Sequence, residues 1–189
     1  MIHKLSNGTT PSPDSLVDVI SRNYSNEKTT FIIPLTFPDV SVAADRLTHV
    51  GYGGDVWELR VDLLSPENVL GRTNMPSTAY VKQQLDTLQR LSDLPILFTI
   101  RTASQGGKFP DDAHQEALKL MFLAIEAECS YIDVEIEWPT SMINEIVKNK
   151  ANSRIIASFH DWTGNIRWTS QTLKDKYAEA DRFGGISSL

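Results

Sequence analysis

Charged and polar side chains recur at alternate positions within four apolar segments of this sequence. The sets are Glu58, Arg60 and Asp62; Thr99 and Arg101; Asp133, Glu135 and Glu137; and Ser158, His160 and Trp162. Successive side chains of a β-strand point to opposite faces, so each set would share one face of its strand. Carboxylates, guanidinium groups and an imidazole together can bind a polar substrate and move protons. The spacing therefore predicts a polar site to which several strands contribute.

The elements that would position these residues alternate regularly from residue 30 onward. Strand-like runs cover 30–35, 56–63, 95–102, 131–138 and 154–162, and helix-like stretches cover 40–50, 78–91, 111–128, 141–149 and 171–183. In the third helix-like stretch, Ala117, Leu120 and Met121 follow helical spacing. Strands that alternate with helices predict an α/β fold with right-handed crossovers and a parallel sheet.

Charge inside these strands helps to choose between two α/β architectures. For one strand alone, the alternation is also typical of the solvated face of an antiparallel sheet. In a parallel sheet covered by helices, buried charge is costly unless it is paired. The mouth of a (β/α)₈ barrel gathers such side chains at the carboxyl ends of its strands. An open doubly wound sheet is disfavoured because 34–39, after the first strand, has no glycine-rich phosphate-binding loop.

Four short motifs at compatible spacing resemble type I 3-dehydroquinate dehydratase, a barrel of the class I aldolase type. The motifs are Glu58-Leu59-Arg60-Val61-Asp62, Phe98-Thr99-Ile100-Arg101-Thr102 with Gln105-Gly106-Gly107, Asp133-Val134-Glu135, and Ser158-Phe159-His160-Asp161. The resemblance runs from about residue 31 to residue 184. It is strongest to the fungal versions within the AROM polypeptide and to the related quinate-pathway repressor. It implies conversion of 3-dehydroquinate to 3-dehydroshikimate in the shikimate and quinate pathways, with no cofactor and no metal.

The resemblance also implies a role for each matching residue. His160 would act as the general base and then as the general acid, and Glu135 would orient and tune His160. The substrate hydroxyls and the reacting region would be held by Glu58, Arg60 and Arg101.

Other residues in the motifs receive structural roles. Asp62 and Asp133 are expected to be pairing partners, and Gly106-Gly107 to form either a plain turn or a mobile loop. Trp162 and Trp168 are expected to pack outside the site.

The sequence departs from the family near residue 188. Family members carry a lysine there, which forms a Schiff base with the substrate ketone, and this chain has Ser188. A serine hydroxyl cannot form an iminium ion, so we expect the chain to be inactive as given. Lys174 and Lys176 fall on a helix-like stretch instead. We expect a partial barrel of five to six βα units that is not closed, completed by a homodimer or by neighbouring domains.

Three functions stay open from the sequence. The chain could be a dehydratase domain whose activity depends on further sequence. It could instead be a non-catalytic, ligand-sensing module of a quinate-pathway repressor, with a regulatory protein as partner. A metal-dependent barrel isomerase would use Glu58, Asp133, Glu135 and His160 as ligands.

Composition sets the wider limits. The formal net charge of −6 argues against direct nucleic-acid binding, and no run suits a membrane span. A lone Cys129 suits a reducing compartment, so we expect the cytosol or the nucleus. We expect residues 1–29 to be a leader or linker and residues 30–189 to be the domain. Within the leader, only the stretch from Ser15 to Ile20 is expected to be able to dock on another part of the protein.

Overall fold

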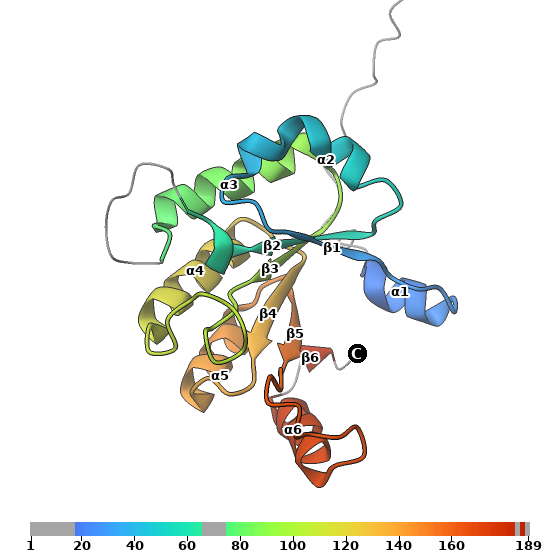
Figure 1. Ribbon diagram of the computed structural model, residues 1–189, viewed down its shortest axis with the longest axis vertical. Coiled ribbons are helices and arrows are strands. Elements are labelled where there is room, and N and C mark those ends of the chain that lie inside the picture. The colour runs from blue at the N-terminus through green and yellow to red at the C-terminus, as the bar shows by residue number, and fades with distance from the viewer. Residues whose placement is uncertain (1–17, 66–74, 184–185, 188–189) are drawn as a thin grey trace, which may run out of the picture.

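A six-stranded parallel sheet is the centre of the fold (Figure 1). The computed structural model describes residues 18–65, 75–183 and 186–187. The strands pair in sequence order and are β1 Ile32–Leu35, β2 Val56–Arg60, β3 Ile96–Thr99, β4 Tyr131–Glu135, β5 Arg154–Ser158 and β6 Ile186–Ser187. Within the described residues β1 and β6 each pair with one neighbour, so the sheet is open. The predicted α/β fold, an unclosed part of a barrel, is confirmed.

Helices α2 to α5 cover one face of this sheet (Figure 1). The helical elements are α1 Val19–Ser25, η2 Val40–Ala43, α2 Ala44–Val50, η3 Val61–Leu63, α3 Thr78–Leu91, α4 His114–Glu126, α5 Thr140–Asn149 and α6 Gln171–Arg182. Side chains of Ser77 and Ser170 cap α3 and α6 by accepting a hydrogen bond from a backbone N–H of the first turn. The predicted helices from residue 40 onward are all present, with ends that shift by a few residues.

The main hydrophobic core lies between the sheet and these helices. Every second strand residue contributes to it, as the alternation of side chains requires. It includes, all buried, Trp57, Leu59, Phe98, Ile132 and Val134 from the strands and Val81, Leu85, Leu120, Met121 and Ile143 from the helices. The remaining strand residues therefore face the opposite, concave side, where the charged sets lie.

The strands end earlier than the sequence predicted. β2 ends at Arg60 and continues as a 3₁₀ turn, β3 ends at Thr99, and β5 ends at Ser158. Beyond β3 the backbone turns to pair with Phe109, whose N–H donates to the Arg101 carbonyl over 3.1 Å. Arg101 and His160 therefore lie in loops directly after their strands, and not inside them. Apolar composition marks a buried segment but not the residue at which its ladder of hydrogen bonds stops.

Helix α1 lies at the amino ends of the strands, on the face that α2 to α5 leave open (Figure 1). The Tyr131 hydroxyl donates to Asp18 Oδ1 over 2.9 Å and accepts from the Ile20 N–H over 3.3 Å. Arg154 Nε lies 3.3 Å from Asp18 Oδ2. The Ile20 side chain packs with a second apolar cluster formed by Val56, Leu97 and Tyr131. Part of the predicted leader thus docks on the sheet, while the domain boundary at residue 30 stays a prediction.

Replacing Tyr131 by phenylalanine should loosen α1 without opening a cavity. The change removes two hydrogen bonds of a buried hydroxyl, so we expect the free energy of unfolding to fall by about 1–3 kcal/mol. Urea denaturation followed by circular dichroism measures this difference. Tyr24→Phe, at a side chain that is 82% exposed, is the control and should change nothing. Equal stability of the two variants would contradict the docking role of Tyr131.

Candidate active site

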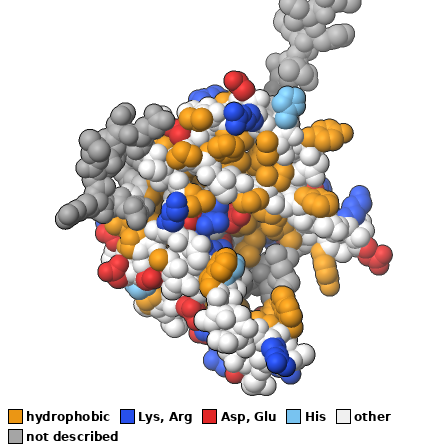
Figure 2. Space-filling model, viewed as in Figure 1, with side chains coloured by type: hydrophobic (Ala, Val, Ile, Leu, Met, Phe, Trp, Pro, Cys, Tyr) orange, Lys and Arg blue, Asp and Glu red, His pale blue; other side chains and the backbone are white. Residues whose placement is uncertain are grey.

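Charged side chains from four neighbouring strands meet at the carboxyl ends of those strands. Glu58 and Arg60 are on β2, Arg101 follows β3, Glu135 ends β4 and His160 follows β5. Figure 2 shows basic and acidic side chains beside one another near the ends of β2 and β3. Because parallel strands direct their carboxyl ends to one edge, residues far apart in sequence come together there.

Arg101 is the centre of this cluster. Its buried guanidinium donates through Nη1 to Glu135 Oε1 over 3.1 Å and to Ser158 Oγ over 2.8 Å, while Nη2 pairs with Asp133. One cation thus joins two carboxylates of β4 and a hydroxyl of β5. The expected structural pairing of Asp133 is observed.

Glu135 is held from two sides. Besides Arg101, it accepts from the Thr102 hydroxyl at Oε2 over 2.6 Å and from the Thr102 N–H at Oε1 over 3.0 Å. Burial raises the pKa of Glu135, and the Thr102 hydrogen bonds and the Arg101 charge oppose that rise. Thr102 is a site residue that the sequence analysis did not single out, because threonine in an apolar run is also common in strands.

The second buried carboxylate, that of Asp133, has fewer hydrogen-bond partners than Glu135. Burial raises the pKa of Asp133 against the opposing charge of Arg101. Among the described residues, Asp133 Oδ1 and Thr99 Oγ1 are buried without a hydrogen-bond partner. A buried acceptor without a donor is costly, so the Arg101 pair carries most of the compensation for Asp133.

Arg60 and Glu58 form the neighbouring part of the cluster. Arg60 makes a bidentate pair with Asp62, with Nε to Oδ1 at 2.9 Å and Nη2 to Oδ2 at 2.8 Å, and this pairing raises the pKa of Arg60. The expected structural role of Asp62 is therefore observed. Glu58 is half-buried, and its carboxylate makes no hydrogen bond within the described part of the chain, although its charge acts on Arg60 and Asp133.

His160 has a different hydrogen-bond partner from the one expected. Its backbone N–H donates to Gln105 Oε1 over 2.9 Å, and its Nδ1 lies 3.3 Å from the same oxygen. The oxygens of Glu135 are taken by Thr102 and Arg101, and no hydrogen bond joins Glu135 to His160 within the described residues. Within the described residues, the hydrogen bond that can orient His160 thus comes from Gln105 and not from Glu135.

Burial and neighbouring positive charge together lower the pKa of His160, so its imidazole is neutral near pH 7. Partial burial of the ring and the positive charges of Arg101 and Arg60 lower the pKa of His160 to about 4. The residue still reaches solvent, so its ring is accessible to a small molecule. A neutral, accessible imidazole beside two guanidinium groups can accept a proton from a bound anion.

The Gln105-Gly106-Gly107 turn is constrained by close packing. Gly106 has φ +84°, and a Cβ there would lie 2.1 Å from the Trp162 ring. A Cβ on Gly107 would lie 2.0 Å from the Arg101 carbonyl oxygen. Only glycine fits at both positions, which gives this motif a physical reason beyond a plain turn. Trp162 is 68% exposed and Trp168 is 89% exposed, so both indoles lie largely at the surface, although the Trp162 ring also packs against Gly106 of this turn.

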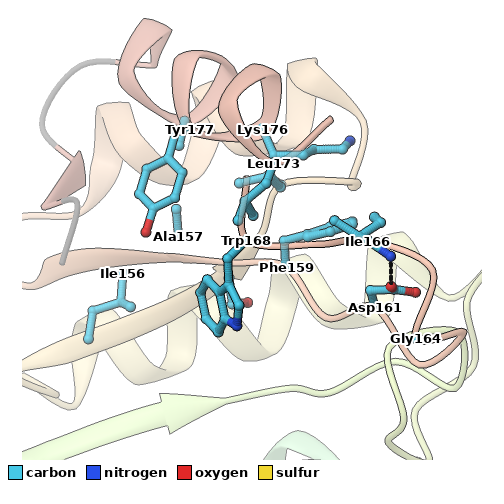
Figure 3. A pocket seen from close by; sticks show the side chains of 13 residues that line it. Ile156, Ala157, Phe159, Asp161, Gly164, Ile166, Trp168, Leu173, Lys176 and Tyr177 are labelled. Atoms are coloured by element: carbon cyan, nitrogen blue, oxygen red, sulfur yellow. Dashed lines mark hydrogen bonds between the residues drawn. The ribbon is translucent and has the colours of Figure 1, made fainter. Parts of the chain in front are cut away.

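A hollow of about 480 Å³ lies beside the charged cluster, between β5 and α6. Its wall is mostly apolar and includes Ile156, Phe159, Trp168 and Tyr177 (Figure 3). Figure 2 shows it as a recess with hydrophobic side chains next to α6. It shares Ser158 with the cluster but none of the five predicted site residues.

The His, Cys, Asp and Glu side chains of the described residues form no group of three or more that could hold a metal ion. Within the same part of the chain, no helix combines the length and the apolarity that crossing a membrane requires.

The fold and the charged cluster define a domain of the (β/α) barrel class with its polar site at the strand ends. The family model for type I 3-dehydroquinase matches residues 31–186, so the chain belongs to the type I 3-dehydroquinase family.

Relatives and solved structures agree with this assignment. A pentafunctional AROM polypeptide of Mycosarcoma maydis is 40% identical over 173 residues, which are 91% of this chain and 10% of that protein. The dehydroquinate dehydratase and shikimate dehydrogenase structure from S. pombe AroM has a TM-score of 0.81 at 32% identity, over 86% of this chain and 31% of that one. A 3-dehydroquinate dehydratase from Geobacillus kaustophilus, 20% identical with a TM-score of 0.70 over 85% of this chain and 60% of that one, shares the fold. The chain thus spans about a tenth of its curated relative.

Removing the positive charge of Arg101 should destabilise the fold. We expect Arg101→Met to lower the free energy of unfolding by about 3–5 kcal/mol, because two buried carboxylates lose their partner. Urea denaturation near neutral pH measures this loss. The control Lys82→Met removes one partner of an exposed pair and should cost at most about 1 kcal/mol. Similar small losses in both variants would show that Arg101 does not hold the strand ends together.

Neighbouring positive charge contributes to the lowered pKa of His160. We expect Arg60→Gln to raise the pKa of His160 towards its ordinary value of 6.5, as measured by NMR titration. Arg154→Gln removes the same charge at the amino end of β5 and should leave this pKa unchanged. An unchanged or lower pKa in the Arg60 variant would contradict the electrostatic cause.

The same depressed pKa has a consequence for stability. Between about pH 6.5 and 4 the unfolded chain binds more protons at His160 than the folded chain, so this contribution to stability is lost as the pH falls. The variant His160→Gln should therefore lose less stability than the parent over this interval.

Proposed function

We propose that the charged cluster is the substrate-binding and proton-transfer part of a dehydroquinase site, and that it takes 3-dehydroquinate or a quinate-like ring. The observation that carries this proposal is the neutral His160 next to the guanidinium groups of Arg60 and Arg101. Those cations would attract an anionic, hydroxylated ring. The half-buried Glu58 carboxylate, free of hydrogen bonds within the described residues, would accept from a ring hydroxyl.

His160 would carry the proton in the reaction. Its neutral imidazole would take a proton from the carbon beside the substrate carbonyl, and the imidazolium would return that proton to the departing hydroxyl, which leaves as water. In a site completed by a Schiff-base lysine, the product would be 3-dehydroshikimate. Glu135 would act through the Arg101 and Thr102 network, which fixes the floor of the site, because it makes no direct contact with His160.

We also propose that this 189-residue polypeptide binds its ligand without dehydrating it. Ser188, which the resemblance aligns with the Schiff-base lysine, lies outside the described residues. Lys176 on α6 is held elsewhere, 3.5 Å from Glu137 and 3.3 Å from Glu179, with its ammonium 5.4 Å from the centre of the Phe159 ring. Lys174 is exposed on the same helix. The two lysines of α6 are therefore not expected to take the place of the missing Schiff-base amine.

Binding without turnover would equally suit the alternative function, a ligand-sensing module of a quinate-pathway regulator. In both cases a homodimer or a neighbouring domain would cover the edges of the open sheet, which for the described residues are β1 and β6. A protein partner whose binding changes with quinate would favour the sensor. Dehydratase activity recovered when the chain is part of a longer polypeptide would favour the enzyme domain.

Borohydride trapping separates binding from Schiff-base chemistry. We expect calorimetry to show that the chain binds 3-dehydroquinate. The affinity should fall at least tenfold in Arg60→Gln, because the variant loses about one hydrogen bond between a charged group and the ligand. Reduction of the mixture with borohydride, followed by mass measurement, should show no ligand adduct. The variant Ser188→Lys tests the alignment and should form an adduct. An adduct on the parent chain would overturn the proposed inactivity, and an absence of binding heat would overturn the proposed ligand.

A further inference from the structure

Gln105 connects His160 to a carboxylate that the proposed mechanism does not use. This side chain is 2% exposed and lies between Glu137 and His160. Its Nε2 donates to Glu137 Oε2 over 2.9 Å, and its Oε1 accepts from the His160 N–H over 2.9 Å. Both ends of one buried amide are therefore occupied, by groups from loops that follow β4 and β5.

The chemistry of these partners leaves one orientation for the amide. An ionised carboxylate only accepts hydrogen bonds, so the NH₂ group must face Glu137. A backbone N–H only donates, so the amide oxygen must face His160. The two contacts reach the same assignment independently, which removes the usual ambiguity between the amide oxygen and nitrogen of glutamine.

That orientation decides which nitrogen of His160 carries the hydrogen. His160 Nδ1 lies 3.3 Å from Gln105 Oε1, an atom that can only accept. The pair is a hydrogen bond only if Nδ1 is protonated. In a neutral imidazole the other nitrogen, Nε2, then holds the free lone pair.

We propose that Glu137 is a positioning residue, which acts through Gln105 to hold His160 in the Nδ1–H tautomer and leaves Nε2 as the basic nitrogen. The tautomer itself requires only the contacts above. The use of Nε2 as the base in dehydration rests on the proposed function.

Glu137 has a support of its own. Its Oε1 lies 3.5 Å from Lys176 Nζ on α6, and Lys176 also pairs with Glu179 at 3.3 Å. Because Lys176 contacts Oε1, the other oxygen of Glu137, Oε2, can accept the hydrogen bond from Gln105. Side chains on α6 and on the loops after β4, β3 and β5 thus form one sequence of contacts that ends at the imidazole.

The backbone next to Gln105 is fixed as well. Gly106 adopts φ +84° under the Trp162 ring, and the Gly107 N–H donates to the Thr102 carbonyl over 2.7 Å. Trp162 follows His160 by two residues, so the turn that carries Gln105 packs on the loop that carries His160. This packing limits movement of the amide away from the imidazole.

The tautomer can be measured directly, without substrate. Two-dimensional NMR that correlates the ring nitrogens of ¹⁵N-labelled histidine with its ring protons distinguishes a protonated from an unprotonated nitrogen. The chain has four histidines, and His160→Gln assigns the signals of His160. Near neutral pH, above the pKa of His160, we expect Nδ1 to give a pyrrole-type signal and Nε2 a pyridine-type signal.

Variants of Glu137 test its role. In Glu137→Leu the buried NH₂ group of Gln105 loses its acceptor, which is costly enough to move the amide away from His160. We therefore expect the two nitrogen signals to move towards intermediate positions or to exchange. Glu137→Gln keeps an oxygen that can accept from Gln105 and should retain the parent pattern. Glu179→Leu removes the other acidic partner of Lys176 without touching Gln105, so it is the matched control and should change nothing.

Two results would overturn the proposal. One is an Nε2–H signal in the parent chain, and the other is an unchanged pattern in Glu137→Leu while circular dichroism shows a folded protein. Neither depends on ligand binding. Loss of the calorimetric signal would instead count against the proposed function and leave the tautomer assignment standing.

Discussion

The buried guanidinium of Arg101 is the interaction on which the rest of this site depends. It follows β3, and it joins Asp133 and Glu135 of β4 to Ser158 of β5. Two carboxylates share one buried cation, so the cluster is stable only while every donor is in place. The same cation lowers the pKa of His160 from across the site. One cation thus acts both on the packing of the strand ends and, together with burial, on the pKa of the imidazole.

The two ends of the concave face have opposite chemistry. At the amino ends of the strands, Val56, Leu97 and Tyr131 make an apolar surface on which α1 packs through Ile20. At the carboxyl ends the same strand faces carry the charged cluster. Each strand therefore changes, within a few residues, from an apolar end covered by α1 to a polar end that carries the charged cluster. Because side chains alternate between the two faces of the sheet, this change does not affect the core beneath α2 to α5.

The sequence allowed the parallel α/β fold and the meeting of Glu58, Arg60, Arg101, Glu135 and His160 to be predicted, because polarity of period two in consecutive buried strands places the polar side chains on one shared face. It could not show which acceptor faces His160. Gln105 lies next to two glycines, and a turn composition says nothing about a partner 55 residues away. The docking of Asp18 on Tyr131, across 113 residues, was hidden for the same reason. Hydrogen bonds between distant loops follow from the packed geometry and not from local pattern.

Two separate networks then act on His160. Burial, with the charges of Arg101 and Arg60 acting without contact, lowers the pKa of the imidazole and keeps it uncharged. Gln105 sets which nitrogen is free, because a hydrogen bond acts only at contact and in one direction. The amide between Glu137 and His160 is neutral, so it transmits the orientation of a carboxylate without delivering its negative charge to the ring. A carboxylate in the place of Gln105 would favour the imidazolium and oppose the effect of the two arginines. A neutral link is therefore the choice that keeps both properties of the base, its low pKa and its defined tautomer, compatible with each other.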